Sequence, residues 1–419
     1  MEAYETVTRS RTKVSLLLTT VLFIVFAFSF FNYLLPAGSG PFALAVLALL
    51  LLGYSVLTNA RISKPQAAYI VLVIVFSLVS LLPAPYSIAK ETGVPVSLVR
   101  VTLLLIGVSF GLQKGWHQYA TTFAVCLSGV HAVFTLIGYV FPSIYLSQII
   151  PRLPSEVAFE ALRFYRSNLH PGITWQIGAN AVYMAGGMAG VYPSIVCGSR
   201  KGLGLVAFAV FLLALLLTGK RGQLLSILVG LWFASTFDAK LKRKSAISRS
   251  VLVLVLLTVL TTLVITFIPD AATPFLRFSS NAGRDITSGR LRLYMSAIAL
   301  FTEKPILGWG TGAFSYLYGM GAHNAYLAVL CENGVLGFLA FASVFVSNLW
   351  ITLRASRVAC DMYTEDRKAL LFSVAMQVFF LVYAMTGNPL HDAFIFALYV
   401  TASVIPWSIL RDAGTGYGG

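Results

Sequence analysis

Charged residues are scarce in this chain. Only 11% of its 419 residues are Asp, Glu, Lys or Arg, whereas 58% are hydrophobic and the mean hydropathy is +0.83. A soluble domain carries about 25% charged residues, so this composition excludes an ordinary soluble protein. We therefore predict an all-α polytopic membrane protein, since apolar runs of membrane-spanning length are typical of transmembrane helices.

Cysteine and acidic residues are also few. The four cysteines lie too far apart for a disulfide framework or a metal-binding box: Cys126, Cys197, Cys331 and Cys360. The acidic residues predicted to be external are equally scattered: Glu91, Asp270, Asp285, Glu303 and Asp392. We therefore expect neither a metal ion nor another cofactor.

The formal net charge is +15, which raises the possibility of a nucleic-acid partner. The basic residues lie mostly in short loops beside apolar runs, as in Lys240-Leu-Lys-Arg-Lys244. Basic residues in such loops orient a membrane protein and contact anionic lipid. We predict membrane lipids as partners and no nucleic acid.

Twelve apolar runs of membrane-spanning length lie between positions of Pro, Gly or charge. They are 14–35, 42–58, 67–82, 98–112, 119–141, 173–196, 203–217, 224–237, 251–268, 325–353, 369–386 and 393–410. Lys and Arg are more frequent in the loops that face inside when the N-terminus is inside. We predict about 12 transmembrane helices with both termini in the cytoplasm.

These spans divide the chain into four parts. Residues 1–268 carry the first nine spans with an external loop at 142–172, and residues 269–322 form an external region with an amphipathic helix. Residues 323–411 carry the last three spans, and residues 412–419 form a cytoplasmic tail.

Each of the two external segments contains one helical pattern. In the first, Ser155 is expected to cap a helix that runs to Leu169 and lies on the lipid surface. In the second, a helix runs from Ser288 to Lys304 and stops before Pro305. Its apolar stripe, expected to pack on the membrane domain, is Leu291, Tyr294, Met295, Ile298 and Phe301.

Two arginines of this second helix differ in their relation to the stripe. On a helical wheel Arg290 flanks it, whereas Arg292 points more nearly away. We therefore prefer Arg290 for a role inside the protein. The following Gly308-Trp-Gly-Thr-Gly312 is predicted to be a loop, and it is no nucleotide-binding fingerprint because no strand precedes it.

A short hairpin carries two further cations. The apolar stretch 203–237 must cross the membrane twice, so each leg has about 17 residues, roughly 26 Å, against a hydrocarbon core of about 30 Å. The tip, Thr218-Gly-Lys-Arg-Gly222, is thereby drawn to the headgroup plane. Lys220 and Arg221 would meet lipid phosphates there, or a lipid-linked pyrophosphate.

The most informative motif is His323-Asn-Ala-Tyr-Leu, with Glu332 and Gly334-Val-Leu-Gly337 downstream, because a titratable base lies where a loop meets an apolar helix. The order of this motif after Lys220-Arg221, Ser288-Gly-Arg290 and Pro305-Ile-Leu-Gly-Trp-Gly resembles the O-antigen ligase and O-antigen polymerase superfamily. The resemblance covers about the C-terminal half. It implies a GT-C-like membrane glycosyltransferase in a bacterial cytoplasmic membrane, which needs no metal and uses an undecaprenyl-pyrophosphate-linked glycan donor on the external face.

The residues fit that chemistry. Transfer requires an acceptor hydroxyl made nucleophilic, for which His323 is the expected general base. It also requires the developing pyrophosphate charge to be stabilised, for which Arg221 and Arg290 offer bidentate contacts in place of a divalent cation. Back-side attack would invert the anomeric centre. We assign the following residues to substrate binding: Lys220, Asn324, Arg292, Arg100 and Tyr326.

Each assignment has a structural alternative. His323 could be a solvated or capping residue, Arg221 could merely reach the headgroups, and Arg290 or Arg292 could pair with Asp285. Glu332 lies nine residues beyond His323 and, on a straight helix, would bond a neighbouring helix rather than orient the histidine. His117 and His131 are expected to be structural. Arg100, His170 and the His391-Asp392 pair could line an acceptor path.

Three functions remain open. A polymerase would join lipid-linked repeats, with a chain-length regulator as a partner, and it is our leading interpretation because the external segments are modest in size. A ligase would transfer glycan to a lipid A core. A transporter or flippase is the distant alternative, since apart from His131 and Glu332 no predicted span carries an acid or base near its centre.

Overall fold

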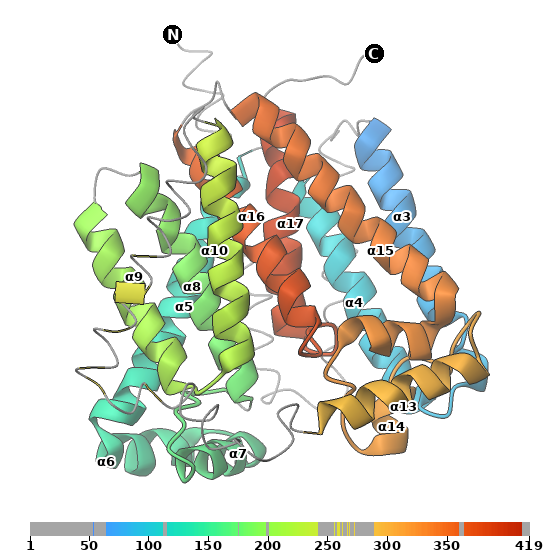
Figure 1. Ribbon diagram of the computed structural model, residues 1–419, viewed down its shortest axis with the longest axis horizontal. Coiled ribbons are helices and arrows are strands. Elements are labelled where there is room, and N and C mark those ends of the chain that lie inside the picture. Colours follow the sequence, from blue (N-terminus) through green and yellow to red (C-terminus); the bar gives the residue numbers. More distant parts are fainter. Residues whose placement is uncertain are drawn as a thin grey trace. The chain divides into compact units, whose positions relative to one another are not determined.

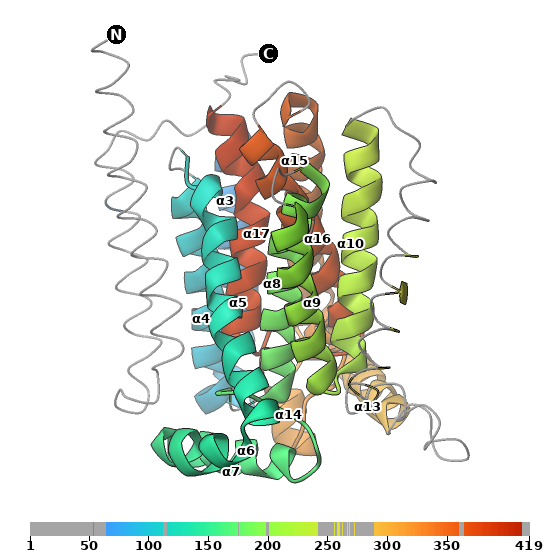
Figure 2. The ribbon, with the colours of Figure 1, turned by 90° about the vertical axis from the view of Figure 1, so that its left-hand side faces the viewer.

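The computed structural model describes residues 64–111, 115–174, 176–197, 201–241, 289–359 and 364–412, together with a few isolated positions. Every regular element in these ranges is a helix, which confirms the all-α prediction (Figures 1 and 2). The chain divides into two compact units. Unit 1 comprises Met1–Ala120, Thr287–Ala359 and Ala384–Gly419, and unit 2 comprises Thr121–Ile286 and Cys360–Tyr383.

Nine of the predicted membrane spans coincide with helices of the described ranges. Six of these helices are long and apolar enough to cross a membrane, namely those at 66–86, 90–111, 117–140, 325–357, 365–384 and 395–412. The helix Lys201–Leu217 is apolar but shorter. The predicted spans 14–35, 42–58 and 251–268 lie outside the described residues. A membrane protein is therefore supported, whereas the count of twelve spans is not confirmed.

Unit 1 is built around four long helices that pack on one another. The helices of this unit are α3 (Lys64–Leu81), η2 (Ala84–Tyr86), α4 (Lys90–Gly111), α13 (Arg290–Glu303), α14 (Ala313–Tyr318), α15 (Ala325–Ala359) and α17 (Ala393–Asp412). Helix α15 packs against α3 and α17, and α17 packs against α4. The Asn348 amide donates hydrogen bonds to the hydroxyls of Tyr69 (3.3 Å) and Tyr399 (3.1 Å), which joins α15 to α3 and α17 where no water is at hand.

Unit 2 is centred on α8, whose small residues allow close packing. Its helices are α5 (His117–Val140, which begins in unit 1), α6 (Pro142–Ile144), η3 (Tyr145–Ile149), η4 (Ile150–Arg152), α7 (Ser155–Tyr165), α8 (Ile177–Cys197), α9 (Lys201–Leu217), α10 (Arg221–Leu241) and α16 (Thr364–Ala384). Helix α8 packs against both α9 and α10. A Cβ atom at Gly187 would lie 2.5 Å from the Phe211 ring, so only glycine permits this approach of α8 and α9.

The first amphipathic helix differs in its ends from the prediction. Helix α7 begins at Ser155 after Pro154, without a side-chain cap, and ends at Tyr165 rather than Leu169. The proposed Ser155 cap is therefore wrong, because the extended backbone of Pro154 already precedes the first turn. Val157 and Ala161 are buried, while Phe159 is 68% exposed.

Candidate active site

The predicted catalytic histidine lies directly before α15. His323 is partly exposed and has a backbone φ of 53°, and among the described residues only Asn168 and several glycines share a positive φ. Such a conformation is uncommon for a residue with a Cβ atom and persists only when surrounding contacts impose it. The segment that carries His323 is therefore held in place by other parts of the protein.

The residues after His323 explain how α15 starts. The Asn324 side-chain oxygen accepts a hydrogen bond from the Leu327 amide at 3.1 Å, which is an N-cap interaction. Tyr326 is partly buried, and its ring lies edge-on to Phe341 with centroids 6.2 Å apart. Both residues thus have structural contacts beside the substrate-binding roles predicted for them.

Helix α15 is broken near its start. Gly334 has φ 64° and ψ −168°, outside the helical region, so the helix consists of a short first piece and a long second piece that run in different directions (Figure 1). The straight helix assumed from the sequence is wrong, because glycine can adopt this non-helical conformation at little cost. The break leaves backbone amides and carbonyls without partners inside the helix, so they need partners elsewhere.

The loop before α14 supplies those partners. The Trp309 and Gly310 amides donate to the carbonyls of Cys331 (3.0 Å) and Glu332 (2.7 Å), before the break. The Val335 and Leu336 amides, after the break, donate to the carbonyls of Pro305 (2.8 Å) and Ile306 (3.3 Å). The glycine-rich stretch predicted to be a plain loop therefore completes a discontinuous helix. A Cβ atom at Gly308 would lie 2.4 Å from the Glu332 backbone, which explains the need for glycine there.

Helix α13 packs on α15 with a face that only partly overlaps the predicted stripe. Leu293, Ala297 and Leu300 are buried, whereas three residues of the stripe are exposed: Leu291 (59%), Met295 (61%) and Ile298 (43%). The prediction is wrong for these three, while Tyr294 and Phe301 of the stripe are partly buried and Phe301 packs against the buried cluster. The small Ala297 lies at the centre of the packed face.

Arg290 and Arg292 lie on opposite sides of α13 in the structure as well. Arg290 is partly buried and shares the packed face with Leu293 and Ala297, three and seven positions on. Arg292 is exposed. The preference for Arg290 over Arg292 thus agrees with the packing, although the packed face is centred on Leu293, Ala297 and Leu300 and not on the predicted stripe.

Tyr294 connects α13 to the His323 segment. Its hydroxyl lies 3.3 Å from the carbonyl oxygen of His323 and 3.3 Å from that of Met385, and can donate to either. Tyr294 is one helical turn after Arg290, so Arg290 and His323 belong to the same end of unit 1. The sequence pattern contained Tyr294 only as one member of an apolar stripe.

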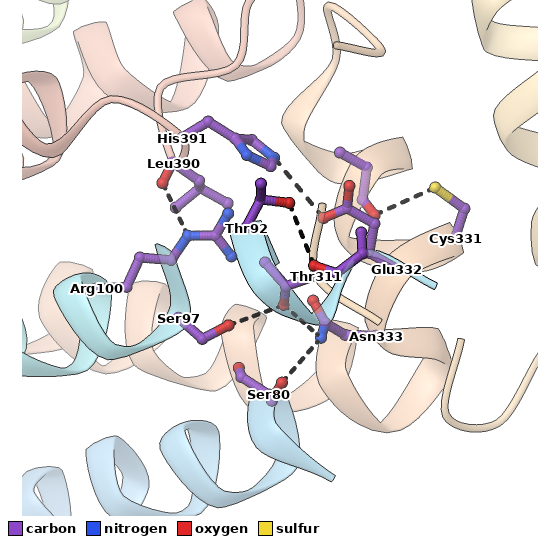
Figure 3. Close-up of polar contacts among 12 residues, drawn as sticks. Ser80, Thr92, Ser97, Arg100, Thr311, Cys331, Glu332, Asn333, Leu390 and His391 are labelled. Atoms are coloured by element: carbon purple, nitrogen blue, oxygen red, sulfur yellow. Dashed lines mark hydrogen bonds and ion pairs between the residues drawn. The ribbon is translucent and has the colours of Figure 1, made fainter. Parts of the chain in front are cut away.

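A buried cluster of charged side chains surrounds the break in α15 (Figure 3). Arg100 of α4 is 3% exposed, and its Nε donates to the Leu390 carbonyl at 2.8 Å. The Glu332 carboxylate is 2% exposed, and its Oε2 lies 3.7 Å from His391 Nε2. Arg100 was expected to line an external acceptor path, but the structure buries it inside the helix bundle of unit 1.

Beside the cluster, the Thr311 hydroxyl also joins α4 to α15. The Thr311 hydroxyl accepts hydrogen bonds from Ser97 (3.0 Å) and from the Asn333 amide (3.2 Å), as Figure 3 shows. A Cβ atom at Gly93 would lie 1.7 Å from the Thr311 carbonyl oxygen. The loop 308–312 therefore packs tightly between the start of α4 and the break in α15.

Lys220 and Arg221 lie on a tight turn in unit 2. The turn consists of residues 218–220, with Gly219 at φ 66°, and the Leu217 carbonyl accepts a hydrogen bond from the His170 amide at 3.1 Å. Arg221 is the first residue of α10, and the Lys220 ammonium lies 5.9 Å from the centre of the Phe164 ring. The predicted turn between two helices, with Lys220 and Arg221 at it, is confirmed, whereas its position at the headgroup plane stays a prediction.

The two predicted catalytic arginines share a position in their helices. Arg221 begins α10 and Arg290 begins α13, where Gly289 at φ 80° provides no side-chain cap. Helix N-termini carry partial positive charge and free backbone amides, so a cation there adds to a potential that favours anions. Each arginine thus stands where a phosphate group would be stabilised.

The other histidines and the acidic residues complete the picture of the described residues. His117 lies 3.0 Å from the Ser408 hydroxyl and His131 stacks on Tyr183, with centroids 3.9 Å apart. His170 is buried between the edges of Tyr139 and Tyr165. Within these described ranges, no three His, Cys, Asp or Glu side chains gather closely enough to hold a metal ion.

These features define a helical membrane protein with a base and two cations at helix starts. Residues 206–342 match the family described as O-antigen ligase, which confirms the resemblance to the O-antigen ligase and polymerase superfamily. The match includes Lys220, Arg221, Arg290, Arg292 and the residues from His323 to Glu332, but not Arg100. No curated protein matches the chain.

Proposed function

We propose that this protein is a membrane glycosyltransferase of the cell envelope, and that it acts as a polysaccharide polymerase on lipid-linked repeats. The observation that carries the proposal is the position of His323. Within the region that matches the O-antigen ligase family, it is a partly exposed imidazole in a rare backbone conformation at a helix start. Backbone strain of about 1–3 kcal/mol per residue is found preferentially at functional sites.

The proposed reaction forms one glycosidic bond. The acceptor hydroxyl attacks the anomeric carbon of the donor sugar as His323 takes up the hydroxyl proton. The bond between that carbon and the pyrophosphate oxygen breaks, and undecaprenyl pyrophosphate leaves with the bonding electrons. Arg221 and Arg290 stabilise the leaving charge, so no metal ion is needed, and attack from the back side inverts the anomeric centre.

Several features of the protein belong to the same proposal. The bundle is GT-C-like with about 12 spans in the bacterial inner membrane, both termini are cytoplasmic, and the site opens on the external face. In this proposal His323, Arg221 and Arg290 act on the same lipid-linked donor. Lys220, Asn324, Arg292 and Tyr326 contribute to substrate binding, and a chain-length regulator is a partner. The buried Arg100 is not among these substrate contacts.

The ligase alternative uses the same donor chemistry with a lipid A core as acceptor. The purified protein in detergent, supplied with a lipid-linked repeat alone, distinguishes the two. A ladder of longer lipid-linked glycans identifies a polymerase. Transfer that occurs only after addition of lipid A core identifies a ligase.

The broken helix α15, with Glu332 at the break and Arg100 buried beside it, also favours a transporter as a second candidate. Transporters place ionisable residues at such breaks. Proteoliposomes with a fluorescent lipid-linked repeat test this function. Movement of the lipid between leaflets without any new glycosidic bond would reject the transferase proposal.

A further inference from the structure

The buried cluster of unit 1 is attached to a connecting segment rather than to helices alone. Residues 385–391 form the connection before α17, and both charged groups of the cluster reach it. The Arg100 Nε donates to the Leu390 carbonyl at 2.8 Å, and the Glu332 carboxylate lies 3.7 Å from the His391 ring, as Figure 3 shows. The two side chains therefore hold one short stretch of backbone from two sides.

The cluster contains groups of opposite charge type. Arg100 and Glu332 are both buried and interact electrostatically. Burial, followed by the nearby Arg100 cation, lowers the pKa of His391 to about 3, so the His391 ring is neutral at physiological pH. Buried groups of opposite charge contribute little net stability, because desolvation of both offsets their attraction. The placement of Arg100 and Glu332 is therefore better explained by the segment that they contact.

The segment held by the cluster contacts the segment that carries His323. The Tyr294 hydroxyl lies between the carbonyl oxygens of Met385 and His323, 3.3 Å from each. A Cβ atom at Gly321 would lie only 1.9 Å from Nδ2 of the Asn388 side chain, so the Asn388 side chain packs directly on the backbone of Gly321. A shift of residues 385–391 would thus be transmitted to the strained backbone at His323.

We propose that Arg100 and Glu332 are positioning residues: by fixing residues 385–391, they hold the His323 segment in its active conformation. This inference rests on the proposed function for the role of His323 in transfer. Neither residue contacts the reacting atoms. The cluster acts through the backbone of Leu390 and His391 and through the contacts of Tyr294 and Asn388.

The first experiment measures the segments without any assay of transfer. Hydrogen–deuterium exchange of the detergent-solubilised full chain compares the wild type with Glu332→Gln. Exchange in residues 385–391 and 319–324 is expected to become several-fold faster. The matched control is Asp238→Asn, which breaks the buried ion pair of Asp238 and Arg367 in unit 2 and should leave exchange in both segments unchanged. Unchanged exchange in Glu332→Gln would overturn the proposal.

The second experiment separates positioning from stability. Glu332→Gln leaves a lone buried cation and should lower the unfolding temperature, whereas the double variant Arg100→Gln with Glu332→Gln removes both charges and should regain it. The double variant still lacks the guanidinium on Leu390. The kcat of the double variant is therefore expected to remain about 10²-fold below that of the wild type, which is the loss typical when a catalytic group is displaced by about 1 Å. Its KM is expected to change less than about threefold. Recovery of kcat together with stability would overturn the proposal.

A third variant leaves both Arg100 and Glu332 in place. Gly321→Ala should press on Asn388 and lower kcat in the same way, whereas Gly129→Ala, a helical glycine of α5 with nothing within 4 Å, serves as the control. If Gly321→Ala retained wild-type kcat, the contact between the segments would have no role and the proposal would fail. Absence of transfer by the wild type, with the expected exchange changes, would reject the proposed function and leave the positioning contact intact.

Discussion

The two segments predicted to carry catalytic residues are built in different ways. In unit 2, Lys220 and Arg221 lie at the end of a turn of residues 218–220 that joins two successive helices, and Arg221 begins the second of them. In unit 1, His323 depends on contacts from α13, from the broken part of α15 and from the connection before α17. A local turn positions the cations, whereas long-range packing positions the base.

This difference separates two kinds of sensitivity to mutation. The turn of unit 2 should tolerate changes elsewhere, because its geometry comes from Gly219 and from hydrogen bonds to nearby residues. The His323 segment should respond to substitutions far away in the sequence, such as Tyr294 or Gly334, because those residues fix its backbone. Variants of both segments can therefore test whether the base and the cations differ in this way.

The largest effect is expected at His323. Replacement by Ala or Gln should lower the rate of glycan transfer by about 10²-fold to 10⁴-fold, the contribution typical of a general base. Expression and unfolding temperature should stay near those of the wild type, which size-exclusion profiles and thermal melts would establish. Near-normal turnover of the lipid-linked donor would remove His323 from the mechanism.

The cationic positions should come next. Arg221→Lys and Arg290→Lys should each reduce kcat on the order of 10²-fold, as removal of one donor to a charged transition state does, because an ammonium cannot reproduce the planar fork. Transfer by the wild type should be insensitive to EDTA. Arg163→Lys is the matched control, an exposed arginine of α7 that pairs with Glu160. An absolute requirement for Mg²⁺ or Mn²⁺ would contradict this account.

The substitution Gly334→Ala tests whether the break in α15 is needed to hold the His323 segment. Alanine at a position with φ 64° and ψ −168° costs about 1–3 kcal/mol in strain, and its Cβ would lie 2.2 Å from the Ile306 carbonyl oxygen. Gly334→Ala should lower both the unfolding temperature and transfer. Gly319→Ala has a similar φ of 68° in open space and should be milder. Equal effects of the two variants would mean that the clash at the break is unimportant.

The smallest effect separates capping from substrate binding at Asn324. Asn324→Ala should lose about 1 kcal/mol of stability with the N-cap, whereas Asn324→Asp retains an acceptor for the Leu327 amide. If Asn324 is a cap alone, Asp should restore both stability and KM for the donor. A raised KM in Asn324→Asp, with normal stability, would instead support a contact of Asn324 with the anionic donor.

Apolar runs and turn residues were enough to predict the helices and the cationic hairpin. A run of apolar residues in lipid must satisfy its own backbone hydrogen bonds, so its length and its interruptions define α3, α9 or α16 almost independently of the rest of the chain. The order of the motifs around His323 was likewise enough to predict the family resemblance.

Tertiary structure alone decided three further features: which face of α13 packs, the break at Gly334, and the burial of Arg100. Hydrophobic patterning did not identify the packed face of α13, because Leu291 and Met295 stay exposed while the small Ala297 is buried. The break forms because the amides and carbonyls of residues 305–310 complete the hydrogen bonds of α15. Arg100 can be buried because Glu332, 232 positions later, supplies the opposite charge. Such partners meet only in the folded chain, so no local pattern could have predicted them.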